Sequence, residues 1–343
     1  MTALPSLMLQ ETEQAAAIVA GLLQDQRLVF EEIAALFASR KPALISTCAR
    51  GSSDHATTYF KYLAEITLGL PVASLGPSVA SVYNAPLQLG SAVHFTVSQS
   101  GASPDIVAMQ RAAKNAGAVT IAVVNVTDSP LARDADIVLA LGAGTEKSVA
   151  ATKSFIASAA ALAGVVAAVS KDMSLQNGLQ KLPDALAGVN VAAGNAVENS
   201  LAEKQSLFIG GRGPSMAIAL EAALKAKETS AIHAEAFSLA ELMHGPMRLV
   251  EGGFPIIAFL AQDQAYQHNM LALEHLERIG GSILAISPLD LPWQHIKTPQ
   301  TGSAFVDPLV ALAAYYRVIE AATRRKGFNP DKPLNLNKVT ETV

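Results

Sequence analysis

Short apolar runs rich in Val and Ile alternate along this chain with longer stretches of helical period. The runs that are typical of buried strands lie at 43–47, 93–97, 120–124, 255–259 and 282–286. Two of the longer stretches, 109–116 and 270–279, are followed by glycine, which favours a helix end. Strands separated by helices pair in parallel, because the crossover must return along the sheet. The pattern therefore predicts an α/β protein with doubly wound parallel sheets.

The apolar runs recur at a constant distance along the chain. Arg50 follows the first run and Arg212 follows a run that begins at Ser206, and the two arginines are 162 residues apart. The same offset relates two further pairs of runs, which are 93–97 with 255–259 and 120–124 with 282–286. An offset shared at three places predicts two tandem α/β domains related by an internal repeat.

The repeat divides the chain into four predicted parts. A leading helical segment at 1–35 packs on the body, and the first domain, at 36–180, carries hydroxyl-rich loops. The join lies near 172–194, a stretch that contains Pro183, several glycines and a mixed polar face. The second domain at 195–328 and a tail at 329–343 complete the chain.

The composition suggests that part of the surface is covered by another subunit. Of the 343 residues, 50% are hydrophobic and only 16% are charged, whereas about 25% charged residues are usual for soluble domains. Much of the apolar excess is Ala and Val, which pack helices closely onto sheets. We therefore expect a homodimer.

Charge and hydropathy exclude several classes of protein. The net charge is −4 and no Lys/Arg run stands out, so we expect no nucleic-acid partner. The N-terminus lacks a basic start followed by an apolar stretch, and the most apolar run, 155–169, is shorter than the roughly 20 residues that span a bilayer. We expect a cytoplasmic protein without a membrane partner.

The single cysteine, Cys48, allows neither an intrachain disulfide nor a zinc site built from thiolates. No H-E-x-x-H pattern is present, and Gly211-Arg212-Gly213 lacks the third glycine of a dinucleotide-binding loop. We therefore expect no metal and no cofactor.

Small hydroxyl residues follow the predicted strands of the first half. Gly51-Ser52-Ser53 follows the run at 43–47, Ser98-Gln-Ser-Gly-Ala-Ser103 follows the run at 93–97, and a third loop at 144–152 opens the apolar helix. Ligands of open parallel sheets bind beyond the carboxyl ends of strands, where hydroxyls and the N–H groups of a following helix suit a phosphate. Ser-Gly clusters also act as turn formers and helix caps, but three clusters favour phosphate binding.

A second group of polar residues lies in the second half. On a helix, Glu221, Lys225 and Glu228 share one stripe; such a stripe is also typical of a solvated salt-bridge ladder. Two histidines and three carboxylates then fall between residues 228 and 244: Glu228, His233, Glu235, Glu241 and His244. Imidazoles and carboxylates transfer protons near neutral pH, so this stretch is the candidate catalytic region.

The motifs taken together resemble the sugar isomerase (SIS) family. They are Ser-Gln-Ser-Gly, Ala-Thr-Lys at 151–153, Lys-x-Lys-Glu, His-Ala-Glu-Ala, His-Gly-Pro and a closing Asn-Leu-Asn-Lys, in this order. The chain is similar to the isomerase part of glucosamine-6-phosphate synthase and to SIS-type glucosamine-6-phosphate deaminases. The resemblance implies two flavodoxin-like SIS domains and a phosphorylated amino sugar as the partner.

The resemblance also implies roles for individual residues. The phosphate and neighbouring sugar hydroxyls would be held by Ser52, Ser53, Ser98, Gln99, Ser100 and Ser103, with further contacts from Val149, Ala150 and Thr152. Where the family has Ala-Ser-Thr-Lys, this chain has Ala at position 151, and the lost hydroxyl points to altered specificity.

The implied catalytic residues are Glu228, His244, Lys338 and Lys225. Glu228 would move a proton between C1 and C2 of the sugar, with Lys225 near it. His244 would assist ring opening, in this family often across a subunit boundary. Lys338, in the tail at 329–343, would assist ring opening or imine chemistry.

The expected activity is conversion of glucosamine 6-phosphate to fructose 6-phosphate and ammonia. The synthase needs a glutaminase domain with an N-terminal cysteine, for which the printed sequence leaves no room before the first α/β half. Alternatives are a fructosamine-6-phosphate deglycase, a galactosamine-6-phosphate deaminase or another phosphosugar isomerase. A non-catalytic phosphosugar-sensing module is the alternative of another class; residues 1–35 are too short and insufficiently basic for the DNA-binding domain that a regulator would carry.

Overall fold

A computed structural model describes residues 4–191 and 196–338. Parts of the predicted leading segment, join and tail, at 1–3, 192–195 and 339–343, lie outside the described residues. The chain forms two compact units. The first-sheet unit comprises Ala17–Glu146 and Lys153–Gln180, and the second-sheet unit comprises Met1–Ala16, Lys147–Thr152 and Lys181–Lys338. Each unit is built around one parallel sheet.

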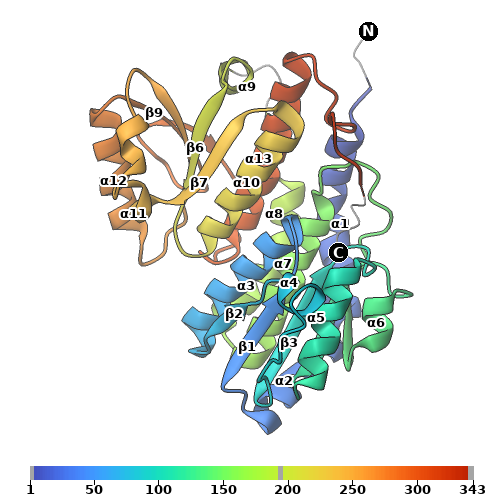
Figure 1. Ribbon diagram of the computed structural model, residues 1–343. Coiled ribbons are helices and arrows are strands. Elements are labelled where there is room, and N and C mark those ends of the chain that lie inside the picture. The colour runs from blue at the N-terminus through green and yellow to red at the C-terminus, as the bar shows by residue number, and fades with distance from the viewer. Residues whose placement is uncertain (1–3, 192–195, 339–343) are drawn as a thin grey trace. The chain divides into compact units, whose positions relative to one another are not determined.

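The first sheet has the strand order β2-β1-β3-β4-β5, and all its strands are parallel. The strands are β1 (Leu44–Cys48), β2 (Val72–Ser74), β3 (Ala92–Ser98), β4 (Val119–Val124) and β5 (Ile137–Ala140). The helices are α3 (Ser52–Leu68), α4 (Ser78–Ser81), α5 (Pro104–Asn115), α6 (Pro130–Asp134) and α7 (Lys153–Ser170). The chain winds outward from β1 in one direction through α3 and from β3 in the other through α5 (Figure 1). Right-handed crossovers then put α3 and α5 on opposite faces of the sheet.

The second sheet repeats this winding with the order β10-β9-β8-β6-β7. Its strands are β6 (Ser206–Gly211), β7 (His233–Ser238), β8 (Phe254–Phe259), β9 (Gly281–Ser287) and β10 (Gln294–Lys297). Its helical segments are α9 (Ala196–Ala202), α10 (Pro214–Ser230), α11 (Leu239–Leu242), η1 (Pro246–Leu249), α12 (Tyr266–Arg278) and α13 (Asp307–Arg325), and α8 (Met173–Ala187) lies between the two sheets in sequence. Taken in chain order, both sheets have the flavodoxin-like order 2-1-3-4-5.

The internal repeat extends to single backbone angles. Gly51, which precedes α3, has φ 55° and ψ −132°, and Gly213, which precedes α10, has φ 59° and ψ −137°. The two glycines are 162 residues apart, and their positive φ is a conformation that side chains with a Cβ rarely adopt. The predicted fold class, two tandem doubly wound parallel-sheet domains, is confirmed.

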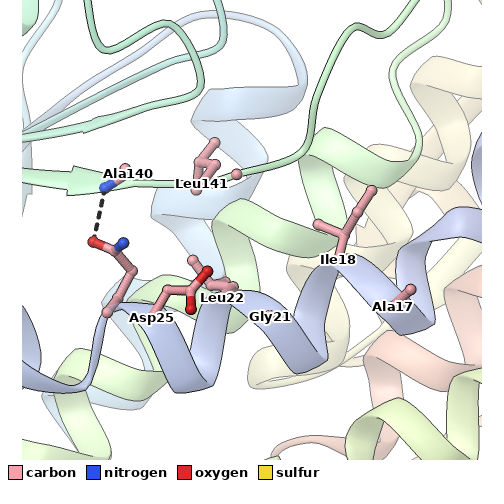
Figure 2. A pocket seen from close by; sticks show the side chains of 9 residues that line it. Ala17, Ile18, Gly21, Leu22, Asp25, Ala140 and Leu141 are labelled. Carbon is pink, nitrogen blue, oxygen red and sulfur yellow. Dashed lines mark hydrogen bonds between the residues drawn. The ribbon is translucent and has the colours of Figure 1, made fainter.

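The leading segment forms two helices, α1 (Leu7–Asp25) and α2 (Arg27–Arg40), where the sequence predicted one. Gln26 interrupts them with φ −95° and ψ 9°. Its side-chain oxygen accepts the N–H of Ala140, at the end of the edge strand β5, at 3.2 Å (Figure 2). A groove of about 260 Å³ lies between this part of α1 and the end of β5. The amide side chain thus pairs an edge N–H that would otherwise need water.

The apolar run after Lys153 forms α7. Among the described residues, α7 is the one helix that is long and apolar enough to cross a membrane. Of its 18 residues, 83% are buried inside the protein. It packs on α3 and α2, and a Cβ placed on Gly164 would lie 2.7 Å from the ring of Phe30. The most apolar run of the sequence is thus a helix buried within the protein.

A histidine is buried in the middle of the first sheet. His94 lies on β3, fully buried, and its Nδ1 is 2.9 Å from Ser46 Oγ on the neighbouring strand. Its Nε2 has no hydrogen-bond partner among the described residues. Burial lowers the pKa of His94 to about 4, because the interior disfavours the imidazolium.

This shift predicts a loss of stability in mild acid. The pKa of His94 is lower in the folded chain than in the unfolded chain. The neutral imidazole therefore contributes fully to the free energy of unfolding above about pH 6.5, and this contribution is lost as the pH falls towards 4. The contribution is about 3 kcal/mol in total. Urea unfolding at pH 7.0, 5.5 and 4.5 should show a smaller pH-dependent loss for His94→Gln than for the wild type. Parallel curves for the two proteins would contradict the buried neutral imidazole.

Candidate functional site

The winding of the first sheet reverses between β1 and β3. Crossovers leave these neighbouring strands in opposite directions, and it is at such a reversal that open parallel sheets generally have a ligand-binding crevice outside the carboxyl ends of their strands. The loop after β1 leads into α3, whose first two residues are Ser52 and Ser53. Ser98 is the last residue of β3, and the loop that follows it ends at Ser103, directly before α5. The structure therefore places the predicted residues of both loops, which also include Gln99 and Ser100, at one edge of one sheet.

The loop after β3 is held by its own hydroxyls. Ser98 Oγ accepts the N–H of Gly101 at 3.0 Å, and Ser100 Oγ accepts the N–H of Ala102 at 3.4 Å. Ser98 and Ser100 thus act as turn formers. Each hydroxyl keeps an O–H to donate to a ligand. Ser103 precedes α5 and makes no side-chain cap hydrogen bond.

Glycine is required at one position of this loop. Gly101 has φ +64°, and a Cβ there would lie 2.2 Å from Ser129 Oγ. The carbonyl of Gly101 accepts the N–H of Leu131 at 3.1 Å. The loop therefore packs its backbone directly on the segment that begins α6, which fixes its shape.

An ion pair that the sequence did not assign joins the two loops. Arg50 lies between β1 and α3, and its Nε and Nη2 both lie 2.5 Å from Oδ2 of Asp105 in the first turn of α5. The carboxylate is fully buried, whereas 47% of the arginine side chain is exposed. The only sequence signal was the recurrence of arginine at the repeat offset, which said nothing of a partner.

The third predicted loop belongs to the second-sheet unit from Lys147 to Thr152. Glu11 of α1 accepts the N–H groups of Lys147 and Ser148, the latter at 3.1 Å. The N–H of Val149 donates to the carbonyl of Asp331 at 3.4 Å. Ala150 and Thr152 in the same stretch are fully buried.

The C-terminal tail is anchored on the same helix. The Asp331 carboxylate accepts the N–H of Leu7 at 2.9 Å and that of Met8 at 2.8 Å, where α1 has unpaired donors. Lys338, the candidate tail lysine, is half-buried. The contacts of Asp331 thus bring the tail to the loop that carries Val149.

The catalytic stripe of α10 is buried, which excludes the solvated ladder. Lys225 Nζ lies 2.5 Å from Glu228 Oε2 and 3.4 Å from Glu221 Oε1. Only 1% of the Lys225 side chain and none of Glu221 is exposed, whereas Glu228 is 21% exposed. Tyr316 donates its hydroxyl to Glu221 at 3.3 Å. The lysine thus bridges two carboxylates, of which one reaches solvent.

The polar residues between 228 and 244 do not form one cluster. Glu228 lies near the end of α10, beside the amino edge of the sheet, because His233 at the start of β7 pairs with Ser206 at the start of β6. His244 follows α11, beyond the carboxyl end of β7, and is exposed. The six residues of β7 separate the two edges by about 20 Å. Within one chain, Glu228 and His244 are not neighbours.

The lone cysteine is unsuited to nucleophilic catalysis. Cys48 at the end of β1 is fully buried, and burial, reinforced by Asp105 and Asp54, raises its pKa to about 12. Among the described residues, no group of three or more His, Cys, Asp or Glu side chains is arranged to hold a metal ion.

The chain is similar to several solved structures and to curated proteins. A candidate phosphosugar isomerase from Silicibacter pomeroyi DSS-3 is 40% identical, with a TM-score of 0.90 over 95% of this chain and 100% of that chain. Glucosamine-6-phosphate deaminase from Thermotoga maritima is 19% identical, with a TM-score of 0.70 over 95% of this chain and 100% of its own, and shares the fold.

A glutamine–fructose-6-phosphate aminotransferase from Aeropyrum pernix is 36% identical over 99% of this chain and 57% of its own length. The chain spans about half the length of the curated relatives it matches. The SIS domain model matches residues 40–168 and 200–290, one match on each sheet. With its two matched sheets, this chain belongs to the SIS domain family.

Proposed function

We propose that the chain is an SIS-type phosphosugar isomerase that converts glucosamine 6-phosphate to fructose 6-phosphate and ammonia. The observation that carries the proposal is the contact between the buried ammonium of Lys225 and the partly exposed carboxylate of Glu228 at 2.5 Å. The contact holds the carboxylate in place, and the exposed part of Glu228 leaves it open to a substrate. A held carboxylate is what abstraction of a proton beside a carbonyl requires.

The proposed reaction moves one carbon-bound proton from C2 to C1, moves a second proton from nitrogen to O1, and releases ammonia. After ring opening, Glu228 takes the proton on C2 and returns it to C1. The C1 aldehyde becomes an alcohol as the C2 amine becomes an imine, with O1 gaining the proton that nitrogen loses. Water then hydrolyses the C2 imine to the ketone and ammonia, so that no oxidant, reductant or metal is consumed.

The phosphate would bind in the β1/β3 crevice. Ser52, Ser53 and the loop from Ser98 to Ser103 supply hydroxyls there, and the N-termini of α3 and α5 supply N–H groups. The Silicibacter relative supports a phosphosugar substrate, and the aminotransferase relatives carry fructose 6-phosphate in their names. Further contacts with the sugar are assigned to Val149, Ala150, Thr152 and Lys338.

A homodimer would complete the site. Glu228 and His244 lie at opposite edges of the second sheet, so His244 of one chain cannot open a sugar that lies at Glu228 of the same chain. A second copy can bring its own His244 to Glu228. In this arrangement, His244 assists ring opening across the subunit boundary.

Ammonia release from a panel of substrates tests the proposed activity. Glucosamine 6-phosphate should be the best substrate, ahead of galactosamine 6-phosphate and fructosamine-6-phosphate conjugates, which are the alternatives of the same class. Glu228→Gln removes the base but keeps a similar shape, and turnover should fall by about 10²–10⁴-fold. Calorimetry should show that the variant still binds the substrate. A near-normal rate would remove Glu228 from this role, and binding without turnover by the wild type would favour a sensor.

Lys225→Met tests the ion pair. The change leaves Glu221 and Glu228 without the cation between them, and breaking a buried pair of this kind costs about 3–5 kcal/mol. We expect a lower urea midpoint and a lower kcat. Tyr316→Phe, which removes one hydrogen bond to Glu221, is the matched control and should cost only about 1 kcal/mol. Unchanged stability in Lys225→Met would mean that the ammonium is not needed to hold the two carboxylates.

Mixed dimers test the shared site. Glu228→Gln and His244→Gln, each inactive alone, are co-expressed with different tags, and the dimers that carry both tags are isolated. One of the two sites in such a dimer contains both native residues, so activity should recover to about half of the wild-type value. If the mixed dimer is as inactive as its parents, the two residues do not meet across a subunit boundary.

A further inference from the structure

About half of the Arg50 side chain is exposed, beside the loops that follow β1 and β3. Arg50 follows β1, and the residue that holds it, Asp105, belongs to the first turn of α5. Building on the proposed function, we propose that Arg50 is a direct ligand of the substrate phosphate, with Asp105 as the residue that orients it. Arg50 is not part of the motifs that carry the family resemblance.

The geometry of the pair leaves one side of the guanidinium available. Both Nε and Nη2 point to a single oxygen, Oδ2 of Asp105. The other carboxylate oxygen, Oδ1, accepts the N–H of Ile106 at 2.9 Å. Nη1 has no hydrogen-bond partner among the residues that the structure describes. The buried carboxylate therefore fixes the plane of the guanidinium while the Nη1 edge stays open.

The position of the pair suits a phosphate between the loops. Arg50 is covalently joined to Gly51 and Ser52, and Asp105 is two residues after Ser103. The ion pair thus joins the segments that supply the hydroxyls at the reversal between β1 and β3. Arginine donates to phosphate through a planar array of N–H groups, which a single ammonium cannot match.

A competing role for Arg50 is electrostatic. Asp105 places a buried negative charge in the first turn of α5, where it would repel a phosphate dianion. Arg50 offsets that charge whether or not it touches the ligand. The two roles make opposite predictions when both partners are removed together.

The first experiment measures binding of glucosamine 6-phosphate by calorimetry on the full chain, with inorganic phosphate as a competitor. Arg50→Gln should weaken the binding of both ligands by about 10- to 100-fold, which is typical for loss of a charged hydrogen bond. Arg50→Lys should lie between Arg50→Gln and the wild type. In the ammonia assay, KM should rise in Arg50→Gln while kcat at saturation stays within about twofold, because the phosphate is remote from C1 and C2.

The matched control is Arg111→Gln. Arg111 lies on α5, is 60% exposed and pairs with Asp134 at 2.6 Å. This variant removes an arginine of similar exposure and pairing from the same unit, and its affinity for both ligands should equal that of the wild type. A loss as large as that of Arg50→Gln would show that net charge, and not contact, controls binding.

The double variant Arg50→Gln/Asp105→Asn decides between the two roles. It also removes the charge of Asp105 that Arg50 offsets, so it keeps the test valid if Arg50→Gln alone folds poorly. Binding that stays weak supports direct contact, and binding that returns to the wild-type value overturns it. Failure of the wild type to bind glucosamine 6-phosphate would sink the proposed substrate as well. If the wild type binds and Arg50→Gln binds equally well, only the inference about Arg50 is lost.

Discussion

A parallel sheet forces every crossover helix to begin at one edge and to end at the other. In this chain the constraint acts twice, on two sheets with the same strand order. In the first sheet it brings the starts of α3 and α5 together at the reversal between β1 and β3, with their N–H groups and hydroxyls. In the second sheet it sends the end of α10, with Glu228, to the amino edge. Binding residues and the proposed base thus use opposite ends of equivalent helices.

The period of the apolar residues was sufficient to predict the fold. Buried parallel strands read as continuous Val/Ile runs, and a fixed offset of 162 residues showed that the same winding occurs twice. The short edge strand β7 was missed, because His233 and Glu235 are exposed and alternate with small residues. The residues between 228 and 244 therefore lie at both edges of the second sheet, since closeness in sequence is lost when a strand runs across the sheet.

Contacts between distant parts of the chain were beyond the reach of sequence patterns. Arg50 and Asp105 are 55 residues apart, and Asp331 lies more than 320 residues from the α1 backbone that it caps. Glu11 adds a contact from α1 to the loop at Lys147. Each residue alone reads as an ordinary surface charge. Only the fold shows that the first part of α1 joins the loop of Val149 to the tail of Lys338, which explains why α1 as far as Ala16 belongs to the unit that carries Glu228.

The buried charges of α10 are better explained by chemistry than by stability. Replacing a buried ion pair with apolar residues of similar volume is often neutral or stabilising, so stability alone gives little reason to keep Glu221, Lys225 and Glu228 together. Of these three side chains, Glu228 is the one that reaches solvent. Tyr316 holds Glu221, Glu221 holds the lysine from the buried side, and the lysine holds Glu228. The group that results is a carboxylate with a fixed orientation and one open face, which an isolated surface glutamate would not provide.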